Sequence, residues 1–256
     1  MGKMEGKVAV ITGCSIGLGK QIAKRFVAEG AKISICARNE TRLEETAKEC
    51  KALGGEVFYR KTDLCVKEDM EQFVSETVDH FGTIDILVNN AISICPPHPF
   101  LEHTEEELLL TMQSGFLATW RMMLLCFPYL KDKNSSIINF GSTGGETGME
   151  GFAAYAAAKE SIRAISRVAA REWGKYGIRV NTCSPAGFTD HVAADLDYLS
   201  DEMKAYIMEG FKNNPMQRIG DPYDDITPAV VFLASDDSRW VTGQNLNVEG
   251  GGNIHS

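Results

Sequence analysis

The chain has 256 residues, of which 44% are apolar and 24% are charged, and its formal net charge is -9. This acidic balance disfavours nucleic-acid binding, which usually needs a basic surface, and favours a small-molecule partner. No run of eighteen apolar residues occurs, so we expect no membrane span and no secretory signal, and we expect a cytoplasmic protein. Seven scattered cysteines without a CxxC pair indicate reduced side chains, with no disulfide framework and no metal site.

Seven short runs of β-branched character alternate with longer segments of helical character. The runs are 7–12, 32–36, 56–60, 85–90, 136–140, 178–183 and 244–248. Strands separated by ten or more helical residues predict βαβ units and a parallel sheet covered on both faces. We therefore predict an α/β fold, with one doubly wound Rossmann-type domain over residues 1–256 and a seven-stranded parallel sheet. An irregular stretch at about 184–223 is a candidate substrate lid, with a plain surface excursion as the alternative.

A glycine-rich turn, "TGCSIGLGK" (12–20), follows the first predicted strand. Glycine lets the backbone approach a pyrophosphate, and the helix that follows presents its N–H groups to the same ligand. The spacing is GxxxGxG, which is neither the GxGxxG dinucleotide fingerprint nor a P-loop. We predict a phosphate cradle whose contacts are Gly13, Ser15, Ile16, Gly17 and Gly19.

The end of the second predicted strand, "ICARNE" (35–40), carries no carboxylate at its tip. A carboxylate there would bind the 2'-hydroxyl of NAD, whereas Arg38 would bind a 2'-phosphate. We therefore expect NADP(H), with Arg38 and Asn39 as contacts. The alternative is that Arg38 is an ordinary surface residue at the start of the next helix.

Tyr155 and Lys159 lie four residues apart in the alanine-rich "AAYAAAKES" (153–161), which predicts a helix with both side chains on one face. A tyrosine can give or take the proton when a ketone and an alcohol interconvert. Its pKa of about 10 falls towards 7 if the phenolate is stabilised by about 4 kcal/mol. One ammonium at about 4 Å supplies energy of that order, so Lys159 is a sufficient partner.

A series of ordered motifs from Lys7 to about Gly252 resembles the short-chain dehydrogenase/reductase family. The motifs are "TGCSIGLG" (12–19), "TDL" (62–64), "NNA" (89–91), "INFGS" (138–142), "YAAAK" (155–159), "IRVNTCSP" (178–185) and "TGQNLNVEGG" (242–251). The resemblance implies a catalytic centre of Ser142, Tyr155 and Lys159, in which Ser142 donates a hydrogen bond to the substrate oxygen. It also implies cofactor contacts at Asp63, Leu64, Asn90, Ala91, Tyr155, Lys159, Pro185 and Thr189.

Three positions depart from the family pattern. Gly115 stands where the family's catalytic asparagine is expected, so another group or bare water must complete the proton relay. Ile92 replaces the glycine after "NNA", where it would crowd the backbone or line the substrate pocket. The segment "PAGFT" (185–189) replaces the usual Pro-Gly pair and makes Thr189 the candidate for the carboxamide contact.

The residues around the expected substrate site are largely apolar. Ile94, Phe100, Met149, Phe152 and Phe188 would line it, and His98 or His103 would contact a substrate oxygen or simply be solvated. We expect an NADP(H)-dependent oxidoreductase that interconverts a secondary alcohol and a ketone, with a hydrophobic or cyclic, steroid-like substrate. The alternatives are a 3-oxoacyl-[acyl-carrier-protein] reductase and a non-catalytic NADP-binding scaffold or sensor.

Arg163, Arg167 and Arg171 repeat every four residues on the helix of Tyr155, and like charges at that step repel each other. Solvent with nearby Glu160 and Glu172 is one way to neutralise them, and docking of an acidic acyl carrier protein is another. We favour a homo-oligomer interface, in a tetramer or a dimer, because the resemblance implies that this helix pairs between subunits. The net negative charge, and Tyr176 where related carrier-protein reductases tend to carry a basic residue, disfavour the carrier protein.

Overall fold

The computed structural model describes residues 2–187, 201–212 and 214–254. The strands in this part of the chain are β1 (Val8–Thr12), β2 (Lys32–Ala37), β3 (Val57–Lys61), β4 (Ile86–Asn89), β5 (Ser135–Phe140), β6 (Ile178–Pro185) and β7 (Asn245–Val248). Its α-helices are α1 (Gly17–Ala28), α2 (Glu40–Ala52), α3 (Lys67–Phe81), α4 (Glu105–Thr111), α5 (Ala118–Leu130), α6 (Thr143–Thr147), α7 (Ala153–Trp173), α9 (Asp201–Lys212) and α10 (Thr227–Ala234). Each predicted strand is present, with ends within two residues of the predicted ones.

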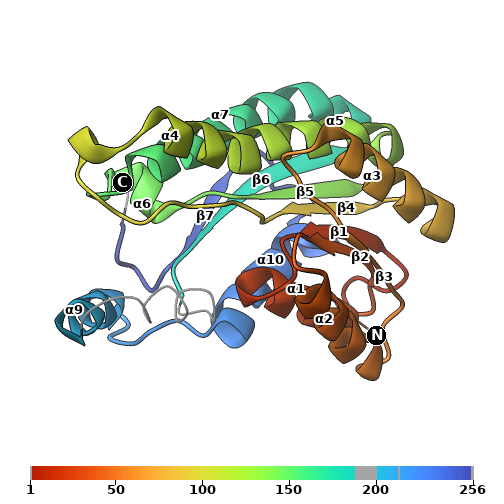
Figure 1. The fold of residues 1–256 in the computed structure, drawn as a ribbon. Coiled ribbons are helices and arrows are strands. Elements are labelled where there is room, and N and C mark those ends of the chain that lie inside the picture. The colour runs from red at the N-terminus through yellow and green to blue at the C-terminus, as the bar shows by residue number, and fades with distance from the viewer. Residues whose placement is uncertain (1, 188–200, 213, 255–256) are drawn as a thin grey trace.

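All the strands are parallel and form one sheet in the order β3-β2-β1-β4-β5-β6-β7. Helices α1, α2 and α10 cover one face, and α3, α5 and α7 cover the other (Figure 1). Each layer buries its own apolar cluster, with Phe26 and Val230 on the first side and Phe73 and Met122 on the second. The predicted α/β fold, with helices on both faces of a seven-stranded parallel sheet, is confirmed.

The order of the strands reverses between β1 and β4. The chain builds from β1 to β3 on one side and then continues with β4 on the other side. In open α/β sheets, ligands bind outside the carboxyl ends of the strands at such a reversal. Here the two ends are fixed together, because Thr12 Oγ1 accepts hydrogen bonds from the backbone N–H groups of Asn90 (3.0 Å) and Ala91 (3.2 Å).

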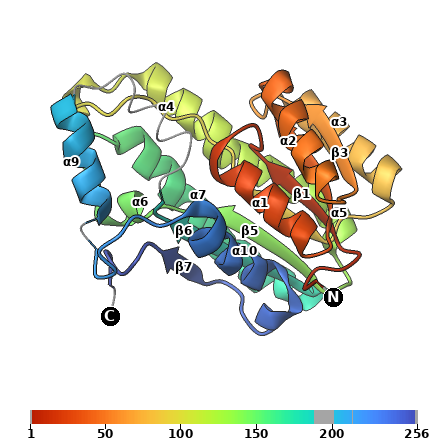
Figure 2. The ribbon, with the colours of Figure 1, turned by 90° about the horizontal axis from the view of Figure 1, so that it is seen from below.

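The prediction of an irregular segment over about 184–223 is wrong for part of its length. Residues 184 and 185 complete β6, and Asp201–Lys212 form α9, which Figure 2 shows set apart from the helices that cover the sheet. The sequence positions Met203, Ile207 and Phe211 are four residues apart, which is a helical period. The mixed polar and apolar composition of the segment instead suggests an irregular structure. Residues 188–200 lie outside the described residues, and the lid remains a prediction.

Helices α4 and α5 are joined by a π-helical turn, Met112–Leu117, into one run from Glu105 to Leu130. Among the described residues, only this run is long and apolar enough to cross a membrane, with a mean hydropathy of 1.2. Met122, Cys126 and Leu130 of α5 are buried in the core cluster between this helix and the sheet. Packing against the sheet therefore accounts for these apolar residues, whereas Leu109 and Leu124 of the same run are exposed. Single π-helical turns occur frequently at functional sites, and this one packs on α7.

Candidate active site

A cleft of about 510 Å³ opens at the point where the strand order reverses. This volume lies within the usual range for small-molecule sites. The predicted site residues that line it are Gly13, Ser15, Ile16, Gly17, Arg38, Asn39, Asp63, Leu64, Asn90, Ala91, Tyr155, Lys159 and Pro185. The fold thus gathers one set of side chains from segments spread over more than 170 positions of the sequence.

The glycine-rich turn forms the wall of the cleft beside α1. Gly13 and Gly17 have φ angles of 74° and 64°, in the left-handed region that glycine favours. The N-cap residue of α1 is Ile16, whose side chain cannot accept hydrogen bonds from the first-turn N–H groups. Uncapped N–H groups and the positive end of the helix dipole attract anions. The turn therefore fits a phosphate group.

Gly19 lies behind this turn and does not line the cleft. A Cβ at residue 19 would lie 2.2 Å from the carbonyl oxygen of Gly13, so only glycine lets α1 pack this closely. Gly19 therefore has a packing role, and its contact with a cofactor stays a prediction. Asn90 also supports the turn, because its Nδ2 donates to the carbonyl oxygens of Thr12 (2.9 Å) and Gly13 (3.2 Å).

At the end of β2 the cleft is bordered by Ala37, Arg38 and Asn39. Arg38 is exposed and forms no ion pair with any described residue, so its guanidinium is available to a ligand. Asn39 has a structural role that the sequence analysis does not assign. Its Oδ1 accepts a hydrogen bond from Arg42 N at 3.0 Å and caps α2.

Ser142, Tyr155 and Lys159 meet beside the end of β5. Ser142 caps α6, and its Oγ accepts from Gly144 N at 3.1 Å, which leaves the hydroxyl proton free to hydrogen-bond Tyr155. Lys159 Nζ is buried, donates to Phe140 O at 2.9 Å and lies 5.5 Å from the centroid of the Tyr155 ring. Helix α7 holds both residues on one face, as the alanine-rich segment predicts.

The protonation of this group differs from the sequence-based expectation. Burial raises the pKa of Tyr155, and the hydrogen bond from Ser142 lowers it by less. Burial lowers the pKa of Lys159 to about 8. Lys159 faces the ring of Tyr155, but desolvation of the phenolate is the largest cause of the Tyr155 pKa shift and sets its direction. The chain by itself therefore holds Tyr155 as a phenol, which is a proton donor.

The two departures at Gly115 and Ile92 are in contact with each other. Gly115 is buried in the π-helical turn, and a Cβ built on it would lie 2.7 Å from Ile92 Cδ1 and 3.8 Å from Ala158 Cβ. The isoleucine side chain thus occupies the space beside residue 115, and Ile92 also lines the cleft. A large residue, Ile92, and the smallest residue, Gly115, thus pack against each other beside the cleft.

Only part of the predicted substrate surface lines the cleft. Ile94 does so, whereas Phe100 is 78% exposed and Met149 is 56% exposed, and neither borders it. His98 and His103 bind Glu107 instead of facing the cleft. Thr189 and Phe188, which we predicted as cofactor and substrate contacts, lie outside the described residues.

Glu146 is a positioning residue that sequence reasoning missed. Its Oε1 accepts hydrogen bonds from Asn245 Nδ2 at 2.6 Å and from Ser184 Oγ at 3.3 Å, which ties α6 and its cap Ser142 to β6 and β7. These partners are 99 and 38 residues away along the chain. No local sequence pattern predicts contacts between residues so far apart in the chain.

Comparison with known proteins places this geometry in a family. A family model described as enoyl-(acyl carrier protein) reductase matches residues 13–253. The chain is 39% identical to a 12α-hydroxysteroid dehydrogenase of a Clostridium species over 98% of both chains. It is 36% identical to an L-fucose dehydrogenase of Oryctolagus cuniculus, over 98% of this chain and 86% of that one. An actinorhodin polyketide ketoreductase solved with NADPH has a TM-score of 0.89 at 28% identity, over 99% of this chain and 100% of the other.

The fold and the length of these matches agree with the order of motifs in the sequence. The chain belongs to the short-chain dehydrogenase/reductase family of oxidoreductases.

Proposed function

We propose that the chain is an NADP(H)-dependent oxidoreductase that interconverts a secondary alcohol and a ketone. The observation that carries the proposal is the contact of Ser142, Tyr155 and Lys159 beside the cleft. A phenol hydrogen-bonded to a serine hydroxyl and faced by an ammonium can hold a carbonyl oxygen and protonate it. The nicotinamide cofactor of this family supplies the hydride.

In the direction of ketone reduction, the substrate oxygen would accept hydrogen bonds from Ser142 Oγ and Tyr155 Oη. The Tyr155 phenol gives its proton to that oxygen as negative charge develops on it. Lys159, with its pKa of about 8, is largely an ammonium at neutral pH and stabilises the phenolate left behind. In the oxidative direction, the same phenolate would take the proton from the alcohol.

The cleft fits NADP(H) at both ends. The uncapped N-terminus of α1 and the turn at Gly13 and Gly17 would hold the pyrophosphate. Arg38 would bind the 2'-phosphate, because no carboxylate lies at the end of β2 to compete for the ribose. Asp63 and Leu64 border the part of the cleft where the adenine would lie.

For the substrate, we propose a hydrophobic or cyclic secondary alcohol. Ile92 and Ile94 bring branched apolar side chains to the cleft. The hydroxysteroid and L-fucose dehydrogenases both act on ring compounds by name, although a sugar is far more polar than a steroid. The apolar lining favours the first of these two classes. A carrier-bound acyl chain is the second candidate, supported by the carrier-protein description of the family model.

A substrate panel with both cofactors tests the proposal. The purified chain should oxidise NADPH with cyclic or steroidal ketones, and Tyr155→Phe should lower kcat by at least about 100-fold, as expected for loss of a general acid. Tyr129→Phe, on the exposed side of α5, is the matched control and should retain full activity. Tight NADPH binding without turnover of any ketone would instead support the scaffold alternative, and turnover of carrier-bound substrates alone would support the reductase of acyl chains.

A further inference from the structure

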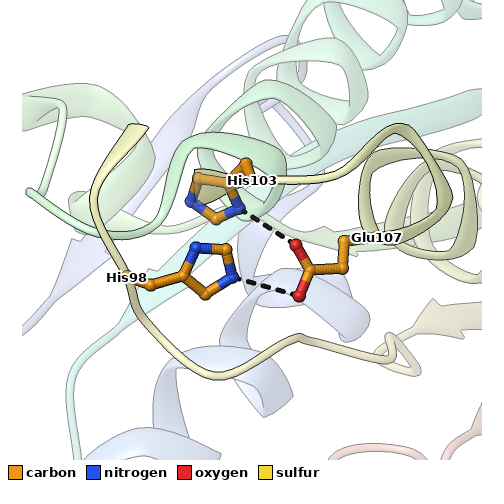
Figure 3. Close-up of side chains that lie close together, drawn as sticks. All are labelled: His98, His103 and Glu107. Atoms are coloured by element: carbon orange, nitrogen blue, oxygen red, sulfur yellow. Dashed lines mark hydrogen bonds and ion pairs between the residues drawn. The ribbon is translucent and has the colours of Figure 1, made fainter. Parts of the chain in front are cut away.

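Two imidazoles and one carboxylate converge outside the proposed catalytic centre. His98 lies between β4 and α4, His103 precedes the N-cap residue of α4, and Glu107 lies in the first turn of that helix (Figure 3). His98 Nε2 is 3.0 Å from Glu107 Oε1, and His103 Nδ1 is 3.6 Å from Glu107 Oε2. The side chains are only 20%, 11% and 26% exposed in that order. The three residues thus form a partly buried His-His-Glu cluster.

The hydrogen bonds of the cluster leave imidazole nitrogen lone pairs that face no hydrogen-bond donor. His103 Nε2 lies 3.2 Å from the carbonyl oxygen of Gly151, which can only accept, so the proton of the neutral ring is on Nε2. His103 Nδ1 then points a lone pair at the Glu107 carboxylate, and two acceptors face each other at 3.6 Å. The Nδ1 atoms of both histidines are buried and have no hydrogen-bond partner. A cation between His103 Nδ1 and the Glu107 carboxylate would satisfy these two acceptors, and His98 would then carry its ring proton on Nδ1.

The spacing of the three groups fits a small transition-metal ion. One ligand atom from each residue lies within 4.8 Å of the other two. Zinc binds nitrogen and carboxylate oxygen at about 2.0–2.2 Å in tetrahedral geometry, so neighbouring ligand atoms lie about 3.3 Å apart. The two facing pairs, at 3.0 Å and 3.6 Å, lie on either side of this value. Two imidazoles also favour zinc over magnesium or calcium, which prefer oxygen ligands.

The cluster joins the segment beside the cleft to the start of the catalytic helix. His98 N donates to Gly151 O at 3.2 Å, and the same carbonyl accepts from His103. Gly151 lies two residues before α7, which carries Tyr155, and Ile94 of the first segment lines the cleft. An ion held here would fix the position of one wall of the substrate site relative to Tyr155.

We propose that His98, His103 and Glu107 bind one zinc ion per chain through His98 Nε2, His103 Nδ1 and the Glu107 carboxylate, with a fourth position open to water. The ion braces the segment between β4 and α4 against the residue that leads into α7. It takes no part in hydride or proton transfer, because the cluster does not border the cleft. This site is independent of the proposed substrate and cofactor.

Metal titration of the full chain tests the site. Protein dialysed against a chelator should bind one equivalent of Zn²⁺ in competition with a chromogenic chelator, and Co²⁺ should give the visible absorption of a tetrahedral site. Glu107→Gln and His103→Gln should each weaken Zn²⁺ binding by at least about tenfold, as expected when a ligand is lost. His80→Gln, an exposed histidine on α3, is the control and should bind Zn²⁺ as the unmodified chain does.

The Glu107→Gln variant separates metal binding from folding. Glutamine preserves the capping box with Thr104, where Glu107 Oε2 accepts from Thr104 N at 3.0 Å, so α4 should remain intact. Circular dichroism and the melting temperature without metal should match those of the unmodified chain. Added Zn²⁺ should raise the melting temperature of the unmodified chain and leave that of the variant unchanged. Equal Zn²⁺ affinity in both proteins, or no stoichiometric site in the unmodified chain, would overturn the proposal.

Discussion

At the scale of single residues, burial decides the chemistry of the proposed catalytic group. Desolvation is the largest cause of both pKa shifts, and it moves the pKa of Tyr155 up and that of Lys159 down, each towards the neutral form. The hydrogen bond from Lys159 Nζ to Phe140 O partly offsets the desolvation cost of the buried ammonium. The buried ammonium beside the Tyr155 phenol therefore lowers the stability of the folded chain.

This loss predicts a pH dependence of stability for Lys159. Its pKa is about 8 in the folded chain and about 10.4 when unfolded, so the unfolded chain binds more protons between these values and the stability rises with pH. The difference corresponds to about 3 kcal/mol. Lys159→Met should therefore gain free energy of unfolding relative to the unmodified chain below pH 8, and the gap should narrow by about that amount towards pH 10.4. Denaturant titrations at several pH values measure it, and a gap independent of pH would contradict the assignment.

Arg38 carries the prediction for cofactor selectivity. Arg38→Asp should raise the Kd of NADPH by at least about tenfold and improve NADH binding, because a carboxylate repels the 2'-phosphate and accepts from the 2'-hydroxyl. Arg42→Asp, in the first turn of α2 and outside the cleft lining, is the matched control. Fluorescence titration with both cofactors gives the ratio. If both variants keep the selectivity of the unmodified chain, the phosphate is recognised elsewhere.

At the scale of elements, the contact of Ile92 with Gly115 fixes how the loop after β4 meets the π-helical turn before α5. The turn packs on α7, and Ala158 lies 3.8 Å from the position of a Cβ at residue 115. A residue larger than glycine at 115 therefore requires the Ile92 side chain to move. The family's asparagine at 115 and the present position of the Ile92 side chain are therefore incompatible.

Paired substitutions test this contact. Gly115→Asn alone should lower the free energy of unfolding by about 1–3 kcal/mol, because its Cβ overlaps Ile92 Cδ1. Adding Ile92→Gly should recover part of that loss, with a coupling energy of at least about 0.5 kcal/mol. Gly174→Asn is the control, since a Cβ there meets no atom within 4 Å. If the changes in free energy of unfolding caused by the two substitutions simply add in chemical denaturation, the contact is refuted.

At the scale of the whole molecule, the reversal of strand order places the cleft, and the outer helices determine what the protein can assemble with. Arg163 is paired with Glu160 on its own helix. Arg167 and Arg171 are exposed on α7 and form no ion pair with a described residue. Two unpaired cations on a helix that covers one face of the sheet favour an acidic surface opposite them.

We expect that surface to belong to another copy of the chain. Arg167→Glu together with Arg171→Glu should shift the assembly from a tetramer or dimer towards single chains of 28.1 kDa. Light scattering after size exclusion measures the mass. Arg42→Glu, on α2 at the opposite face of the sheet, should leave the mass unchanged. An unmodified chain that is already monomeric would exclude the interface.

The sequence by itself determined the fold class, the seven strands and the helix that carries Tyr155 and Lys159. These features depend on local periodicity, on the glycine-rich turn after β1 and on motif order, all of which are written in neighbouring residues. The tertiary structure decided the rest, because it depends on contacts between distant positions. Gly19 packs behind its turn, Ile92 fills the space beside Gly115, and Glu146 reaches Asn245.

The protonation of the proposed catalytic group belongs to the same second category. A lysine four residues from a tyrosine predicts proximity, but burial is a property of the assembled core and reverses the expected direction of the Tyr155 pKa. The same holds for His98 and His103, which sequence alone assigns to substrate or solvent. Only the packing of the segment between β4 and α4 turns them towards Glu107, where two histidines and one carboxylate become a candidate zinc site.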